Sequence, residues 1–151
     1  MGTAAVTFAV VLPALLVAHN LADHWVQTEH QAASKSQRGK AGHRACAAHV
    51  ASYTAVTATV VAVLWVVFGL SISPVGFVVG QLVSALTHYW ADRRSTLAWL
   101  AALTGHKPLY ALGAPRAGRD DNPSLGTGAY ALDQSWHWSW LLAAALLTAV
   151  L

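Results

Sequence analysis

Three histidine–aspartate pairs have the type and spacing of metal ligands, because the two residues of each pair lie four positions apart. The pairs read HNLAD, HYWAD and DQSWH, which are His19 with Asp23, His88 with Asp92, and Asp133 with His137. A spacing of four places both side chains on one face of a helix, where they can share a ligand. Carboxylate and neutral imidazole are suitable ligands for zinc, manganese and iron. Each pair is therefore predicted to contribute to a metal site, with zinc the first choice.

The elements that carry these pairs are predicted to be membrane helices. The chain of 151 residues is 56% hydrophobic and only 10% charged, whereas a soluble domain has about 25% charged residues. Four stretches approach or exceed the roughly 20 apolar residues that cross a bilayer as helix. They are Ala4–Trp25, Ala45–Leu70, Pro74–Asp92 and Ala129–Leu151. We expect an all-α fold, an integral membrane four-helix bundle that forms one domain over residues 1–151.

The basic residues predict the orientation of this bundle. All nine Lys and Arg fall between the first and second stretches or between the third and fourth. The positive-inside rule places both basic loops in the cytoplasm and both termini outside the inner (plasma) membrane. Basic loops beside a membrane account for the net charge of +3, so no nucleic-acid partner is expected. Ser95–Leu103 is too short to span and is predicted to be an interfacial helix in the second cytoplasmic loop.

In this topology the polar residues converge at one depth. The three pairs lie at the cytoplasmic ends of their helices, and His49 lies about one turn into the second helix at the same end. Seven candidate ligands exceed the four that a tetrahedral zinc needs, so the site holds one or two ions, or some carboxylates orient histidines instead. Ser84 and Tyr53 extend the same helix faces and are candidates for substrate contact. The remaining histidines are expected in loops or at the interface: His24, His30, His43 and His106.

The second cytoplasmic loop, residues 91–128, is long for so small a protein. Its end is rich in turn-forming residues and leads directly to Asp133. Such a loop is either a lid over the polar site or a capped entry to the last helix, with Thr127 as the N-cap.

The order of these motifs resembles a known family. LADHWVQTEHQAASK, a histidine in the second stretch, HYWADRR and LDQSWH together resemble the small bacterial and phage membrane proteins called domain of unknown function 3307. The resemblance implies a polytopic membrane protein with the His/Asp pairs as its signature, and it implies no activity. Gln27, Lys35 and Gln134 also match the family pattern, which makes them candidates for shaping the site. The architecture is more loosely similar to membrane-bound metal-dependent hydrolases.

The expected function is that of a metal-dependent hydrolase with its site at the cytoplasmic membrane face. The four histidines of the pattern would bind the metal with help from Asp23, Asp92 and Asp133, and a carboxylate not bound to metal would act as general base. The expected substrate is a lipid or another amphiphile. Two alternatives stay open: a carrier or sensor of metal ions or protons, and a non-catalytic component of a larger complex with a metal-free polar network. The many small residues along the stretches favour a homodimer.

Overall fold

The computed structural model describes residues 2–116 and 126–151, and every regular element in these two ranges is a helix. This confirms the all-α expectation. The elements, in chain order, are α1 (Thr3–Leu21), the π-helix η1 (Ala22–Val26), α2 (Glu29–Ser34), α3 (Gly39–Phe68), α4 (Pro74–Asp92), α5 (Ser95–Leu103), α6 (Lys107–Tyr110) and α7 (Gly128–Val150).

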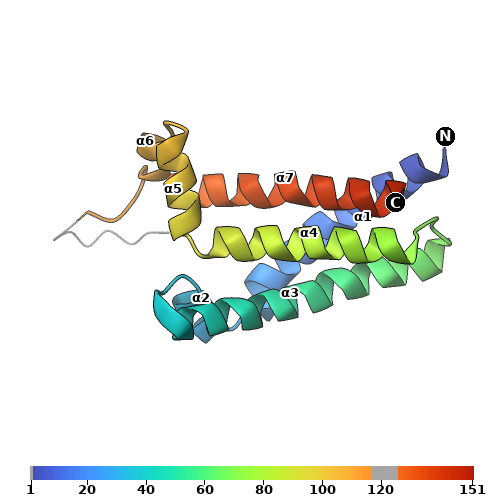
Figure 1. Ribbon diagram of the computed structural model, residues 1–151, viewed down its shortest axis with the longest axis horizontal. Helices are drawn as coiled ribbons and strands as arrows, with labels where there is room; N and C mark the ends of the chain where they lie inside the picture. The colour runs from blue at the N-terminus through green and yellow to red at the C-terminus, as the bar shows by residue number, and fades with distance from the viewer. Residues whose placement is uncertain (1, 117–125) are drawn as a thin grey trace.

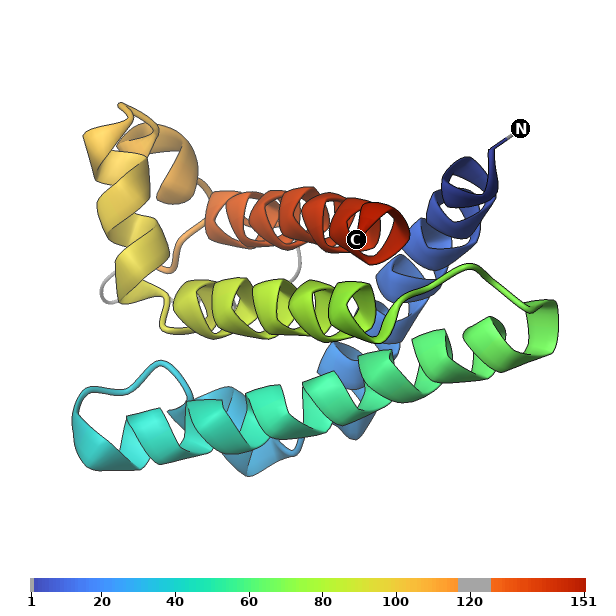
Figure 2. The ribbon, with the colours of Figure 1, turned by 45° about the vertical axis from the view of Figure 1, so that its right-hand side comes forward.

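The four long helices α1, α3, α4 and α7 pack as a bundle with both termini at one end (Figure 1). Helix α4 packs against α3 and α7, and α1 crosses them obliquely and contacts α3 and α7 (Figure 2). The short helices α2, α5 and α6 lie at the end opposite the termini, and α5 runs across the ends of α4 and α7. The apolar core lies toward the termini and includes Val11, Leu15, Val61 and Leu141.

Local signals in the sequence set several helix ends. Helix α4 begins at Pro74, as predicted, because the Ser73 side chain accepts a hydrogen bond from the backbone N–H of Gly76 at 2.9 Å. Thr127 caps α7 in the same way, accepting from the backbone N–H of Tyr130 at 3.2 Å, as the capped-entry alternative for this loop predicted. The lid hypothesis concerns a loop of which residues 117–125 lie outside the described residues, so it stays a prediction.

Helix α3 begins six residues earlier than predicted, at Gly39 instead of Ala45. The prediction located the apolar segment, whereas the helix continues through the basic residues that precede it. His49 therefore lies nearly three turns into its helix, not one turn as the sequence suggested.

Close packing of α4 on α7 depends on Gly80. A Cβ atom at this position would lie 2.1 Å from the Thr148 hydroxyl oxygen and 2.9 Å from the Ala144 carbonyl oxygen. The two backbones can approach this closely only because no side chain intervenes. This contact holds α4 and α7 together on the side of their polar residues that faces the chain termini.

Two helical segments in the described ranges are long and apolar enough to cross a membrane. They are Thr3–Val26, which combines α1 with η1, and Gly39–Phe68, with mean hydropathies of 1.9 and 2.0. The predicted spans 74–92 and 129–151 do form helices, but their membrane crossing is not confirmed. Polar residues such as Gln81 and His88 in α4, and Asp133 and His137 in α7, lower the hydropathy of these two helices.

Candidate metal centre

The three His/Asp pairs and His49 meet between the four long helices, near the end of the bundle that carries α2 and α5. The histidines of this cluster are buried, as is Asp92. The Asp23 side chain is 11% exposed, and that of Asp133 is 26% exposed, which makes it the most accessible of the three carboxylates. The structure thus brings together all seven residues that the sequence singled out as metal ligands, and we call them the His/Asp centre.

Four atoms at the middle of the centre make five close contacts with one another. His49 Nε2 lies 3.0 Å from His88 Nε2. Asp23 Oδ1 lies 3.3 Å from His49 Nε2 and 3.4 Å from His88 Nε2. Asp92 Oδ2 lies 3.2 Å from each of these two nitrogens. Ligand atoms bound at 2.0–2.1 Å around a tetrahedral zinc lie about 3.3 Å apart. These separations therefore suit atoms that share one ion.

The other three members flank these four atoms. The His137 ring lies 4.2 Å from the His88 ring and 4.9 Å from the His19 ring, measured between centroids. Within the pairs, His19 Nε2 lies 3.7 Å from Asp23 Oδ2, and His137 Nε2 lies 3.6 Å from Asp133 Oδ1. Three groups have ligand atoms within 4.8 Å of one another: His19, His88 and His137; Asp23, His49 and His88; and Asp92, Asp133 and His137.

Several buried polar atoms of the centre have no hydrogen-bond partner among the described residues. They are His19 Nδ1 and Nε2, Asp23 Oδ1, His88 Nδ1, Asp92 Oδ2 and His137 Nε2. An unsatisfied buried polar atom costs roughly 1–3 kcal/mol, and more when the group is charged. Coordination of a cation would satisfy the lone pairs of several of these atoms at once. The donor set, imidazole nitrogen with carboxylate oxygen, fits zinc, manganese or iron.

A π-helical turn contributes to the position of Asp23. The chain is α-helical from Thr3 to Leu21 and then widens over Ala22–Val26, the kind of distortion that often occurs at functional sites. Asp23, near the start of this turn, reaches His19 on its own helix and also His49 and His88 on two other helices. The sequence spacing predicted the first of these contacts but not the distortion or the other two.

The residues proposed to support the site also lie at the centre. The Tyr53 hydroxyl and Ser84 Oγ are 2.7 Å apart, and the Tyr53 ring stacks on His88 with centroids 3.9 Å apart. With the Gln27 amide oriented to pair donors with acceptors, its oxygen accepts from His49 Nδ1 at 3.1 Å. This contact places the proton of His49 on Nδ1 and leaves Nε2 free to face the centre. Gln134 donates to Asp133 Oδ2 at 3.3 Å.

Lys35 is a member of the site that side-chain spacing did not predict. It is buried, and its Nζ lies 2.7 Å from Asp92 Oδ1 and 2.8 Å from the Gln27 amide oxygen. Arg93 fixes the segment that carries it, because its guanidinium donates to the backbone carbonyl oxygens of Lys35 and Gln37. In the sequence Lys35 looks like any other residue of a basic loop, and only the family resemblance marked it.

The four histidines expected in loops or at the interface lie outside the centre. All four are exposed: His24, His30, His43 and His106. His43 Nδ1 contacts the Tyr89 hydroxyl at 2.7 Å, and His106 Nδ1 contacts the Thr104 hydroxyl at 3.0 Å. The spacing of four identified His19, His88 and His137, and the predicted depth in the bundle identified His49.

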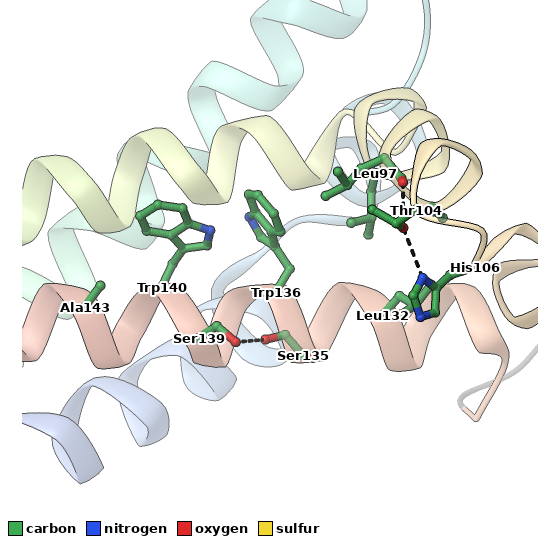
Figure 3. Close-up of a pocket in the computed structure, with 11 residues that line it drawn as sticks. Leu97, Thr104, His106, Leu132, Ser135, Trp136, Ser139, Trp140 and Ala143 are labelled. Atoms are coloured by element: carbon green, nitrogen blue, oxygen red, sulfur yellow. Dashed lines mark hydrogen bonds between the residues drawn. The ribbon is translucent and has the colours of Figure 1, made fainter.

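An apolar groove of about 540 Å³ lies between α7 and the α5–α6 corner (Figure 3). Its lining is mostly apolar and includes Leu97, Leu132, Trp136 and Trp140. The Thr104 and Ser139 hydroxyls in it donate to backbone carbonyl oxygens of Leu100 and Ser135, each at a spacing of four residues, at 2.9 Å and 2.8 Å. Leu132 and Trp136 directly precede Asp133 and His137, so the groove and the centre occupy neighbouring faces of α7.

Comparison with known proteins gives a family and nothing closer. No curated protein and no solved structure matches this chain. The sequence profile of the family described as protein of unknown function (DUF3307) matches residues 11–151, which include every residue of the His/Asp centre as well as Gln27 and Lys35. The chain therefore belongs to the DUF3307 family.

Proposed function

We propose that this protein is an integral membrane metalloenzyme, a metal-dependent hydrolase whose His/Asp centre lies near the cytoplasmic face of the inner membrane. The observation that carries the proposal is the convergence of buried imidazole and carboxylate groups from four helices, with several polar atoms left unpartnered. Groups of this kind are costly inside a membrane and normally pair, line a pathway or bind an ion.

The exposed faces of the bundle support its place in a membrane. Only 28% of the apolar window of α1 and 17% of that of α3 is buried, whereas the core helix of a soluble protein would be mostly buried. Helices α4 and α7 also carry outward-facing apolar side chains at helical spacing: Val75, Val78, Leu82 and Leu86 on the former, and Trp138, Leu142, Leu146 and Val150 on the latter. Exposed apolar surface of this extent favours contact with lipid or with a second copy of the chain. We propose four spans with both termini outside the cytoplasm.

The residues of the centre divide into two roles. His49, His88, Asp23 and Asp92 are the best placed to hold an ion, since their ligand atoms lie 3.0–3.4 Å apart in five pairs. When bound, a divalent transition metal supplies Lewis acidity, which activates water near neutral pH and polarises an ester, amide or phosphoryl bond. Asp133 is the carboxylate with the most solvent access, and its contact with His137 at 3.6 Å suits a general base that passes a proton to an imidazole.

The groove favours an amphiphilic substrate. Its apolar lining and volume of about 540 Å³ suit a hydrocarbon chain, and it lies on the face of α7 next to Asp133 and His137. A lipid whose chain occupied the groove would carry its polar headgroup near the end of the bundle where the centre lies.

A carrier is the second candidate function, because polar side-chain contacts continue from the centre toward the end of the bundle that carries the termini. Tyr53 contacts Ser84, and Thr57 donates to Gln81 at 2.8 Å. Beyond them the interior is closed by the apolar core around Leu15, Val61 and Leu141. Among the described residues, the interior beyond Gln81 is mostly apolar and its buried polar side chains are the hydroxyls of Thr7 and Thr148, which favours an enzyme over a carrier.

Metal analysis of the protein purified in mild detergent without chelator tests the proposal. We expect stoichiometric zinc, manganese or iron in the wild type and a loss of most bound metal in His49→Ala. The matched control is His43→Ala, which removes an exposed histidine of the same helix that lies outside the centre.

Hydrolysis of lipid esters and lipid phosphoesters by the metal-loaded protein then separates an enzyme from a carrier. We expect Asp133→Asn to abolish turnover while bound metal is retained. A wild-type protein without stoichiometric transition metal would show that the centre is a metal-free polar network, and the hydrolase proposal would fall with it.

A further inference from the structure

Lys35 is the one ammonium group that contacts a carboxylate of the His/Asp centre among the described residues. It is 8% exposed and comes from the segment after α2, not from a long helix. A buried lysine loses hydration and side-chain freedom, and a structure tolerates it only when its charge is matched. Its place at the centre therefore calls for a role in the charge balance of the site.

The charges of the centre match one divalent cation once Lys35 is counted. Asp23, Asp92 and Asp133 supply three negative charges and Lys35 supplies one positive charge, so the net charge is two negative when the histidines are neutral. One divalent ion makes this group neutral. Two divalent ions would leave two uncompensated positive charges among buried groups, which is strongly unfavourable.

Arg93 does not change this balance at the ligand atoms. Its guanidinium is directed to the carbonyl oxygens of Lys35 and Gln37, where it holds the segment after α2 against α4. Gly42 permits this approach, because a Cβ atom there would lie 1.9 Å from the Gln37 carbonyl oxygen. The ammonium group of Lys35 is therefore held in place in two ways: Arg93 fixes the Lys35 backbone, and Asp92 binds the ammonium group itself.

Lys35 also determines which Asp92 oxygen faces the cluster. Nζ binds Oδ1 at 2.7 Å, whereas Oδ2 lies 3.2 Å from both His49 Nε2 and His88 Nε2. Oδ2 has no hydrogen-bond partner, whereas Oδ1 is bound by the Lys35 ammonium group. Asp92 can thus offer one oxygen to an ion and not both.

We propose that Lys35 is a positioning residue that restricts the centre to a single divalent ion, its ammonium group taking the place that a second cation would have in a two-ion site. The proposal rests on the proposed function only in requiring that the centre bind a metal ion. It requires neither hydrolysis nor a lipid substrate.

Loading with Mn²⁺ and electron paramagnetic resonance test this proposal on the full-length protein in detergent. In the wild type we expect one bound Mn²⁺ per chain with the six-line spectrum of an isolated ion. In Lys35→Met, which keeps a long apolar side chain but removes the charge, we expect two bound Mn²⁺ per chain and the broadened spectrum of a spin-coupled pair. Lys35→Arg retains the charge, and we expect it to restore the isolated-ion spectrum.

Two further comparisons keep the test decisive. Lys40→Met removes an exposed lysine nearby and should leave one isolated ion. If Lys35→Met does not fold, the single variant Asp92→Asn is compared with the double variant that carries both Asp92→Asn and Lys35→Met. Both proteins lack the Asp92 carboxylate, and they differ only in the charge of Lys35. We expect the double variant to bind Mn²⁺ about tenfold or more tightly than the single variant.

The outcomes are distinguishable. Two coupled ions in the wild type would overturn the proposal while leaving the metal centre intact, and so would one isolated ion in a folded Lys35→Met protein. Equal affinities of the single and double Asp92 variants would also overturn it. No bound ion in the wild type would overturn the proposed function itself.

Discussion

Replacement of Gln27 by methionine should weaken metal binding without removing a ligand. The methionine side chain has about the length of glutamine but cannot accept the hydrogen bond from His49 Nδ1 or the one from Lys35 Nζ, which are 3.1 Å and 2.8 Å long. His49 then loses the contact that fixes its tautomer and ring orientation, and its Nε2 no longer faces the centre in the free protein. The binding free energy must afterwards include the cost of reorienting the ring.

The size of this effect follows from the position of Gln27 behind a ligand. Loss of such a partner typically lowers metal affinity by about 10–100-fold, which corresponds to about 1.4–2.8 kcal/mol. His49→Ala removes the ligand itself and should cost considerably more. The order of affinities should therefore be wild type, then Gln27→Met, then His49→Ala.

Competition with a chromophoric chelator in detergent measures all three affinities on the same scale. Gln37→Met is the matched control, because the Gln37 side chain donates only to the Ala33 carbonyl on an exposed surface. If the affinity of Gln27→Met stayed within about twofold of the wild type, then His49 would not depend on Gln27, and the assignment of its tautomer would be wrong.

Further variants and measurements test the fold, the site and its place in the membrane. We expect His88→Ala to lose most bound metal, because His88 Nε2 contacts three other members of the centre; elemental analysis per folded protein checks this. Gly80→Ala should lower the thermal unfolding temperature in detergent, since overpacking costs about 1–3 kcal/mol. Adding Thr148→Ala should recover part of the lost stability, because it removes the hydroxyl that the new methyl group would meet. Equal unfolding temperatures of Gly80→Ala and the wild type would refute the close packing of α4 on α7. Reporter tags at either terminus should be extracytoplasmic and one near Gly39 cytoplasmic, and a cytoplasmic C-terminus would contradict the four-span proposal. In nanodiscs we expect a homodimer, and a monodisperse monomer by mass photometry would exclude it.

The convergence of these residues at one end of the bundle could be predicted from the sequence because two independent sequence patterns point to it. The spacing of four places His19, His88 and His137 beside an aspartate, and the alternation of apolar stretches with basic loops brings these pairs and His49 to one end of the bundle. The start of α4 was also predictable, because serine followed by proline is a strong signal for a helix start.

The remaining features depend on contacts between segments far apart in the chain. Lys35 pairs with Asp92 only because the segment after α2 folds back on α4, and no local pattern distinguishes it from the exposed Lys40. The start of α3 was missed because hydropathy marks where a helix is apolar and not where its hydrogen bonds begin. The groove beside α7 requires the position of α5 across the bundle end, which spacing along one helix does not contain.

The π-helical turn at Ala22–Val26 has a consequence for the ancestry of the centre. A turn of this kind holds one residue more than the α-helical turn it replaces, so it is the trace that a single-residue insertion leaves in a helix. Deleting one residue there would rotate the chain that follows by about 100°, and Thr28, which caps α2, would enter the loop at a different angle. We expect such a deletion to shift Lys35 relative to Asp92. The completeness of the centre can thus depend on a single residue in the η1 turn.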